Sequence, residues 1–416
     1  MTQLRSMTPS VRMGWAAMAL VSLALFGNFY VYDSIGPVAD LLEQQLGFTD
    51  TQIGTLNAVY SLPNVVLILF GGMLVDRYGA GRMATITAAL CFAGAVLTAA
   101  SSSFPIMTTG RLFYGIGSET FNIATLAAVT LWFPLRHTAL AMGLTLSIGR
   151  AGSFAADISP SALPGVYAQG WQAPLVLAAG LAATSLAGAA LYWWFERRAG
   201  LSGKAHETSA SSPFVLRDLL RFPRTYWYLL VLCVLWYAAI LAFRSTFAIK
   251  YFQHAHGLTL AAAGALNSYV YLSAMFATPF FGWLCDRLNR YSGMLAFGAF
   301  LLPTSLLVMS STELGLGIAT ALIGVSYSLV PAAMWPLVSR LVDSKRFGTA
   351  IGLMWVVQNA GIGSANLIAG HLNDANGAGA DNPAGYDAMM NFFTVSSLLG
   401  FAFALLLWRS TRKANG

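Results

Sequence analysis

The sequence predicts an all-α membrane protein with twelve transmembrane helices arranged as two pseudo-symmetric six-helix bundles. Three observations point to this fold: an apolar composition, twelve long apolar segments, and an internal repeat. The 416-residue chain is 57% hydrophobic and 9% charged, with a mean hydropathy of +0.64. An average soluble domain is about 25% charged. Because a soluble chain could not bury this much apolar surface, most of it must face lipid.

Twelve segments are long and apolar enough to cross a bilayer, which takes roughly 20 residues. They lie at about 14–38, 51–75, 83–100, 104–133, 137–165, 172–195, 225–252, 260–285, 292–310, 314–340, 347–371 and 388–409. The long connection between the sixth and seventh segments is polar, basic and rich in Ser and Gly. We therefore expect an N-terminal bundle over 1–195, a cytoplasmic linker over 196–224 and a C-terminal bundle over 225–416.

The basic residues predict the orientation of the chain in the membrane. Of the 23 Lys and Arg residues, 19 fall in the termini or in loops on one side, and the other loops carry acids instead. Cytoplasmic loops are the basic ones, so both termini and the central linker are expected in the cytoplasm. The net charge of +7 is spread over all the cytoplasmic loops, which argues against a nucleic-acid partner.

The two halves of the chain repeat at an offset of about 210 residues. "GMLVDRYG" (72–79) follows the second span and "GWLCDRLN" (282–289) follows the eighth. "AMGLTLSIGRAG" (141–152) and "AIGLMWVVQNAG" (350–361) form a second matching pair in the fifth and eleventh spans. Two six-span halves in the same orientation are typical of parallel-repeat transporters, which bind their substrate near the midplane between the halves.

These motifs, together with "GRLFYGIG" (110–117) in the fourth span, resemble the major facilitator superfamily over essentially the whole chain. The resemblance implies the major facilitator fold and transport by alternating access. In that family the loop Asp and Arg residues act as a cytoplasmic latch between helices. Carried over, the latch consists of Asp76, Arg77, Asp286 and Arg287. The alternative is that these are ordinary loop charges.

Two opposite-charge pairs are predicted inside the fourth and fifth spans. A charge near the bilayer centre costs about 2.5–3.5 kcal/mol, so each one is expected to have a partner. If the two spans form an antiparallel hairpin, residues equally far from the turn lie at equal depth. This places Glu119 opposite Arg150 at the midplane, and Arg111 opposite Asp157 about two turns further out. The second pair is either a staple between helices or, by resemblance to the family, a coupling group.

The pair of Glu119 and Arg150 is interpreted as functional, because Arg150 aligns with Asn359 in the repeat and its charge has no copy in the other half. A guanidinium can bind a carboxylate through two hydrogen bonds, and Glu119 can accept an ammonium group. Together they suit a zwitterionic ligand. Glu119 is also a candidate proton site, because burial favours its neutral form and Arg150 favours its charged form.

Asp33 and Arg244 lie one residue from matching positions of the first and seventh spans, both in the outer half of the membrane. We expect them to close the cavity toward the outside as a gate; the alternative is two separately solvated vestibule charges. Lys250 is expected to extend to the membrane surface, and His254 to lie there as well. Four aromatic residues are predicted to line the cavity: Tyr60, Tyr237, Trp335 and Trp355.

Four segments resemble one branch of the superfamily, the lysosomal dipeptide transporters: "GRLFYGIGSETFNIA" (110–124), "LAMGLTLSIGRAGS" (140–153), "GVSYSLVPAAMWP" (324–336) and "FGTAIGLMWVVQNAGIGSANLIAGHL" (347–372). The resemblance implies that Glu119 holds the amino end of a dipeptide and Arg150 its carboxylate. The matching residues of the C-terminal half are Tyr327, Trp335 and Asn359. The chain has no N-x-[ST] sequon and short outer loops, which favours a bacterial inner-membrane protein.

The sequence thus predicts an alternating-access transporter of small zwitterionic peptides, either a uniporter or a proton-coupled symporter. One alternative is a proton-coupled carrier of organic anions, in which Arg150 binds the anion and Glu119 the proton. Another is a transporter-like sensor or partner subunit. No nucleophile motif, nucleotide-binding loop or metal-ligand spacing is visible, so no enzyme activity, cofactor or metal is expected. The expected partners are a small-molecule substrate and the lipid bilayer, and the protein is expected to be a monomer.

Overall fold

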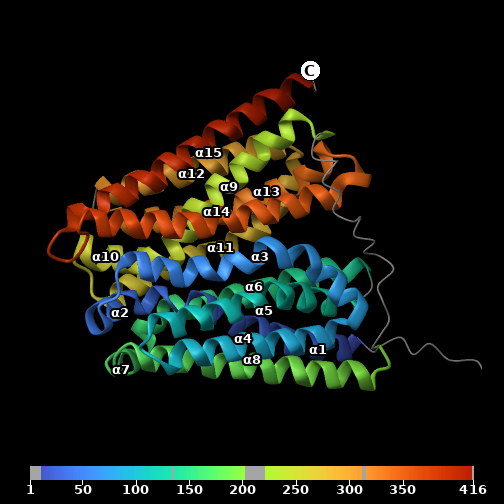
Figure 1. Ribbon diagram of the computed structural model, residues 1–416. Coiled ribbons are helices and arrows are strands. Elements are labelled where there is room, and N and C mark those ends of the chain that lie inside the picture. The colour runs from blue at the N-terminus through green and yellow to red at the C-terminus, as the bar shows by residue number, and fades with distance from the viewer. Residues whose placement is uncertain (1–10, 134, 202–220, 312–314, 415–416) are drawn as a thin grey trace, which may run out of the picture.

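The computed structural model describes residues 11–133, 135–201, 221–311 and 315–414, and these residues form helices with no β-strand among them (Figure 1). Residues 202–220, the centre of the predicted linker, lie outside the described part. The helices of the N-terminal half are α1 (Val11–Asp33), α2 (Ala39–Leu46), α3 (Asp50–Tyr78), α4 (Ala80–Ala100), α5 (Phe104–Thr130), α6 (Leu135–Ala162), α7 (Pro164–Tyr167) and α8 (Gln172–Arg198).

The C-terminal half has α9 (Arg224–Ala242), α10 (Ala248–His256), α11 (Leu260–Leu288), α12 (Tyr291–Ser311), α13 (Leu316–Leu341), α14 (Phe347–Ala375) and α15 (Asp387–Ala414). The short segments are η1 (Gly36–Val38), η4 (Ser344–Arg346) and η5 (Pro383–Tyr386). A π-helical segment, η3 (Phe243–Phe247), joins α9 to α10 in one continuous span. π-Helical turns inside α-helices are rare and occur mostly at functional sites.

The long helices pack as two bundles, one from each half of the chain (Figure 1). In the N-terminal bundle α1 packs on α6 and α8, and α4 packs on α5 and α8. In the C-terminal bundle α9 packs on α14 and α15, and α13 packs on α11 and α12. Two helix pairs join the bundles, α3 with α14 and α6 with α11. α3 and α6 therefore lie at the interface between the two bundles.

Nine helices in the described part are long and apolar enough to cross a membrane, or ten if the bent helix α3 counts as one span. The predicted number of twelve spans is therefore not fully confirmed. The two long helices outside this set are α5 and α6, which carry the four charges discussed above. The charged side chains lower the mean hydropathy of α5 and α6, which is why these two helices fall outside the set.

Local sequence explains several helix boundaries. Thr49 and Gln52 form a reciprocal capping box that starts α3, which satisfies two otherwise unpaired backbone amides. Gly47 ends α2 and Gly257 ends α10, each in a left-handed conformation that glycine adopts without steric cost. The three cysteines are free and buried, which fits a role in core packing.

Candidate functional site

A cavity of about 180 Å³ lies between the two bundles. Helices α1, α3 and α5 line one side, and α9, α11, α13 and α14 line the other. Its lining residues are Asn28, Phe29, Tyr32, Tyr60, Ser118, Glu119, Asn122, Tyr237, Leu241, Tyr271, Tyr327, Trp355, Gln358, Asn359 and Ile362. Pockets for drug-sized ligands are larger, about 300–1,000 Å³, so this cavity fits a small metabolite.

Glu119 is the one charged residue among those that line the cavity in the described part of the chain. The Tyr60 hydroxyl donates a hydrogen bond of 2.9 Å to Glu119 Oε1, and the side chain of Asn122 lies close enough to interact with the carboxylate. Tyr60 is itself packed between the rings of Tyr32 and Tyr114. A carboxylate offers about four acceptor positions, so Glu119 is held in place and can still accept hydrogen bonds from a ligand.

Neutral amide and hydroxyl side chains surround this acid. The amide nitrogen of Asn28 donates to Ser118 Oγ (3.0 Å) and to Asn122 Oδ1 (3.3 Å). Asn28 is 3% exposed, and its Oδ1 has no hydrogen-bond partner among the described residues. A buried acceptor without a partner costs about 1–3 kcal/mol, so this oxygen calls for an explanation.

Four of the five predicted cavity residues outside the charged pair line the cavity: Tyr60, Tyr237, Trp355 and Asn359. Trp335 does not line it and instead stacks on Trp355, with ring centroids 5.1 Å apart. Asn359 donates to the backbone oxygen of Trp355 (3.1 Å). The roles of these residues in binding stay predictions.

The structure does not pair Glu119 with Arg150: no ion pair joins them in the described part of the chain. Arg150 Nη1 instead donates to the hydroxyl of Thr278 in α11, and its guanidinium lies 5.5 Å from the ring centroid of Tyr327, a cavity residue. The hairpin assumption was wrong because α6 packs against α1 and α11 rather than along α5. Arg150 therefore lies beside the cavity and bridges the two bundles.

The predicted pairing of Arg111 with Asp157 is wrong for the same reason. The guanidinium of Arg111 donates to the backbone oxygens of Val31 (3.1 Å) and Tyr32 (3.2 Å) in the last turn of α1. It also reaches Asn57 Oδ1 in α3 (2.6 Å). The last carbonyls of a helix have no intrahelical partner, so Arg111 caps α1 inside the membrane and ties its end to α3.

Asp157 pairs with Arg244 instead. Arg244 Nη2 lies 2.7 Å from Asp157 Oδ2, and Nη1 lies 2.6 Å from Asp33 Oδ1. All three side chains are at most 2% exposed. Asp33 ends α1, Asp157 lies on α6 and Arg244 lies in η3. The triad therefore joins the two bundles, at the end of the molecule that the sequence predicts to face the outside. Its role as a gate stays a prediction.

The surface position predicted for Lys250 is wrong. Its side chain is 1% exposed, and Nζ lies 2.5 Å from Asp50 Oδ1 and 2.5 Å from Glu43 Oε2, both in the other bundle. Burial of an ammonium group requires such partners. The hydropathy pattern does not reveal these two partners, because Glu43 and Asp50 both lie in the short connection between the predicted first and second spans.

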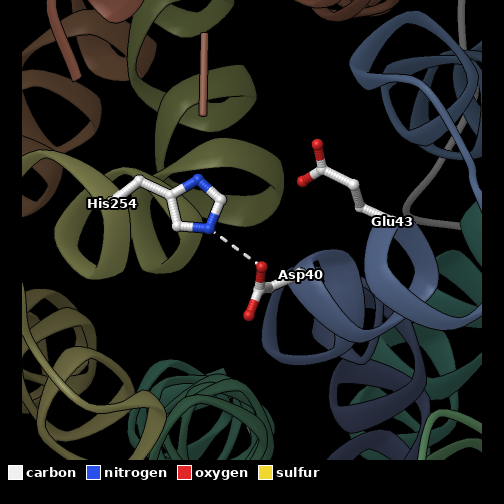
Figure 2. A group of neighbouring side chains, drawn as sticks. All are labelled: Asp40, Glu43 and His254. Carbon is white, nitrogen blue, oxygen red and sulfur yellow. Dashed lines mark hydrogen bonds and ion pairs between the residues drawn. The ribbon is translucent and has the colours of Figure 1, made fainter. Parts of the chain in front are cut away.

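His254 is also largely buried rather than on the surface, at 8% side-chain exposure. Its Nε2 contacts Asp40 Oδ1 (2.9 Å), as Figure 2 shows, and its Nδ1 contacts the hydroxyl of Tyr386 (2.8 Å). Ligand atoms of Asp40, Glu43 and His254 lie within 4.8 Å of one another, close enough to hold a metal ion. The ammonium group of Lys250 already forms an ion pair with Glu43 and would repel a metal cation. These three residues therefore fit a cluster of ion pairs between the bundles better than a metal site.

A further contact closes the same end of the molecule. The carboxylate of Asp374 in α14 accepts hydrogen bonds from the backbone amides of Asp50 (2.8 Å) and Thr51 (2.9 Å) at the start of α3. An acid is stabilised at a helix N-terminus, where amides are unpaired and the helix dipole is positive. We call the contacts made by Arg244, Lys250, His254 and Asp374 between the bundles the outer seam.

The four residues predicted as the cytoplasmic latch are exposed or partly exposed. None of them makes an ion pair with another described residue. Arg77 lies over the ring of Tyr78, and Asp286 accepts a hydrogen bond of 2.7 Å from the hydroxyl of Tyr291 in its own bundle. Within the described part of the chain, the bundles are therefore joined at the outer seam and not through these residues at the opposite end. The latch stays a prediction for another conformation.

Two glycines of the repeat allow the bundles to approach closely below the outer seam. A Cβ at Gly264 would lie 2.5 Å from the backbone oxygen of Asp157, and one at Gly54 would lie closer still to that of Asn366. We expect Gly54→Val and Gly264→Val to force the outer seam open, because backbone atoms cannot move aside as a side-chain end can. The measurement is labelling of a cavity cysteine, Leu241→Cys, by an impermeant maleimide added outside.

The matched controls for this prediction are Gly72→Val and Gly282→Val. They lie on the same two helices, and a Cβ added at either position would have no atom within 4 Å. Labelling of the cavity cysteine should rise strongly in the first pair of variants and stay at the parental level in the controls. Equal labelling in all four would show that the close approach does not hold the bundles together.

Comparison with known proteins matches the chain to one family. The family model described as Major Facilitator Superfamily matches residues 21–366 and, in a second match, residues 243–415. The "Lysosomal dipeptide transporter MFSD1" of Danio rerio is 30% identical over 367 residues, covering 85% of this chain and 79% of that protein. The "Probable sulfoacetate transporter SauU" of Cupriavidus necator is 26% identical, covering 80% of each chain.

Among solved structures, a mutant form of the nucleoside transporter NupG has the same fold, with a TM-score of 0.71 at 14% identity. The similarity covers 95% of this chain and 98% of that one. The match extends over both bundles and confirms the predicted fold class.

Proposed function

The chain belongs to the Major Facilitator Superfamily, a family of membrane transporters and not of enzymes, and we propose that it carries small zwitterionic peptides by alternating access. Glu119 would hold the amino end of the peptide and Arg150 its carboxylate. The observation that carries the proposal is the placement of Glu119: it is an oriented carboxylate in a small cavity between the bundles. The relatives named as dipeptide transporters support the choice of substrate class.

Arg150 is suited to bind a carboxylate even though it does not contact Glu119. In the structure its guanidinium donates to a neutral hydroxyl, that of Thr278, and lies over the ring of Tyr327. A carboxylate is a stronger acceptor than a hydroxyl, because both partners are then charged. A peptide bound at Glu119 could therefore draw Arg150 from Thr278 toward the cavity wall at Tyr327. This exchange would release one contact between α6 and α11.

That exchange suggests how binding is linked to movement. α6 carries Arg150 near its middle and Asp157 of the outer seam about two turns further along the same helix. If the peptide carboxylate shifts α6 relative to α11, the same shift acts on the contact between Asp157 and Arg244. We propose that the outer seam opens to admit substrate and that the latch at Asp76, Arg77, Asp286 and Arg287 pairs when it does.

A second candidate substrate class is an organic anion. The relative named for sulfoacetate covers 80% of this chain, and an anion without an amino group would need Arg150 alone. Glu119 would then serve as a proton site for coupling. The discriminating feature is the need for an amino group in the ligand.

The experiment is a thermal-shift screen of the purified protein with a dipeptide library and with mono- and dicarboxylates and sulfonates. The dipeptide proposal predicts that dipeptides raise the melting temperature and that the same molecules without an amino group do not. Stabilisation by sulfonates or dicarboxylates alone would contradict the dipeptide proposal and support the anion carrier.

The chain is a multi-pass membrane protein. We propose the bacterial inner membrane as its location, on the grounds of its short outer loops and the lack of glycosylation sequons. We also propose that it works as a monomer, with each six-helix bundle acting as one unit of the transport movement.

A further inference from the structure

We infer that Asn28 completes the amino-end subsite, and that Glu119 and Asn28 together select ligands with a free, protonated amino group. This inference rests on the proposed function and goes beyond it by naming a second residue that sets specificity. The two residues come from different helices, α1 and α5, and both line the cavity.

The orientation of Asn28 follows from a chain of hydrogen bonds that starts at Glu119. An ionised carboxylate only accepts hydrogen bonds, so the side chain of Asn122 must turn its NH₂ group toward Glu119. The Oδ1 of Asn122 then faces Asn28, which must present its own NH₂ group at 3.3 Å. That group also donates to Ser118 Oγ. Asn28 Oδ1 is the atom left over.

This leftover oxygen lies on a side chain that is 3% exposed, and it has no partner among the described residues. Buried polar atoms are almost always paired with protein, water or ligand. The rest of the residue is fixed, since the hydroxyl of Tyr114 donates to the Asn28 backbone oxygen at 2.7 Å. A fixed, unpaired acceptor in the wall of a cavity that also contains Glu119 fits a site for a hydrogen-bond donor.

The chemistry of the donor follows from the two acceptors. A primary ammonium group carries three N–H bonds and a positive charge, so it can donate to Glu119 and to Asn28 at the same time. An N-acylated peptide has one N–H at that position and no charge, so it can satisfy at most one acceptor and leaves the other buried without a partner. The subsite should therefore discriminate a free amino terminus from a blocked one.

The test is a thermal-shift titration of the purified full-length protein with dialanine and with N-acetyl-dialanine. We expect Asn28→Leu, which keeps the approximate size but removes the acceptor, to raise the apparent Kd for dialanine by about 10- to 100-fold. N-Acetyl-dialanine, which binds the parent weakly, should change little. The preference for the free amino terminus should therefore collapse.

A matched control is available in Asn64→Leu. Asn64 is fully buried in α3, and its Oδ1 also lacks a partner among the described residues, but it does not line the cavity. This variant should bind dialanine like the parent.

The outcomes separate the inference from the proposed function. If dialanine binds the parent and Asn28→Leu equally well, the inference is wrong and the proposed function stands. If no dipeptide stabilises the parent, the proposed function fails first and the inference falls with it.

Discussion

Glu119→Gln is expected to weaken dipeptide binding by about 100-fold. The amide keeps the shape of the side chain and can still accept a hydrogen bond from Tyr60, which donates to Glu119 at 2.9 Å. The glutamine side chain has no negative charge. Its NH₂ group is a hydrogen-bond donor and would face the ammonium group of the ligand, which is also a donor. A hydrogen bond to a charged group contributes about 1.5–3 kcal/mol, which corresponds to a change of this order. Isothermal titration with dialanine in detergent measures the change.

The control for Glu119→Gln is Asp343→Asn. It removes one carboxylate from an exposed contact with Arg346 at 3.3 Å, and Asp343 does not line the cavity, so this variant should leave binding unchanged. Arg150→Ala provides the complementary test, since it should abolish the preference for a dipeptide over its C-terminal amide. If Glu119→Gln and Arg150→Ala both bound dipeptides as the parent does, the proposed site would be wrong.

Arg244→Ala is expected to cause the largest loss of stability of any single substitution in the outer seam. In the parent protein the Arg244 guanidinium lies 2.6 Å from Asp33 and 2.7 Å from Asp157. The substitution leaves both acids buried without this cation. Removing one partner of a buried ion pair costs about 3–5 kcal/mol. The melting temperature of the ligand-free protein should fall strongly. Arg77→Ala, at an exposed arginine that pairs with no acid among the described residues, should leave it unchanged.

A charge exchange separates a gate from a general loss of stability. The double variant Asp33→Arg with Arg244→Asp keeps opposite charges at these two positions and the same total charge, while Asp157 then faces a second acid at position 244. We expect it to recover part of the transport activity that each single substitution abolishes. If the exchange recovered nothing, the interpretation of Asp33 and Arg244 as a gate would be abandoned.

Depth in the membrane could be predicted from the sequence, but lateral packing could not. The position of Glu119 in the middle of α5 follows from counting residues, and the structure places it in the cavity wall. The partner of Arg150 depends on which helices are neighbours. α6 follows α5 in sequence but packs mainly on α1 and α11, and nothing in the hydropathy pattern of two consecutive spans records this.

The repeat was the better guide to contacts between the bundles. Asp33 and Arg244 lie near matching positions of the two halves, and they are in contact. The same offset also relates Asn57 to Asn267, whose side chains both donate to backbone oxygens of η3 from opposite bundles. Matching residues of two halves related by a pseudo-twofold axis come together only where they lie near that axis, as Asp33 and Arg244 do. These asparagines could have been found from the sequence by the same comparison.

Most of the neutral amide side chains of the cavity could not be predicted from the positions of charges inside the spans. Asn28, Asn122 and Gln358 all line the cavity and all interrupt apolar segments. An amide in the membrane needs hydrogen-bond partners for the same reason that a charge does, although at a lower cost. The acids that pair with Lys250 were missed for a different reason, since they lie in short segments outside the predicted spans.

The central claim is that the cavity between the bundles carries dipeptides across the membrane and that Glu119 binds them. The direct measurement is counterflow in proteoliposomes preloaded with unlabelled dialanine and diluted into labelled dialanine. The parent protein should accumulate label transiently, and Glu119→Gln should accumulate none above protein-free liposomes. Binding of dialanine by the parent without counterflow, or counterflow that Glu119→Gln leaves intact, would contradict the claim.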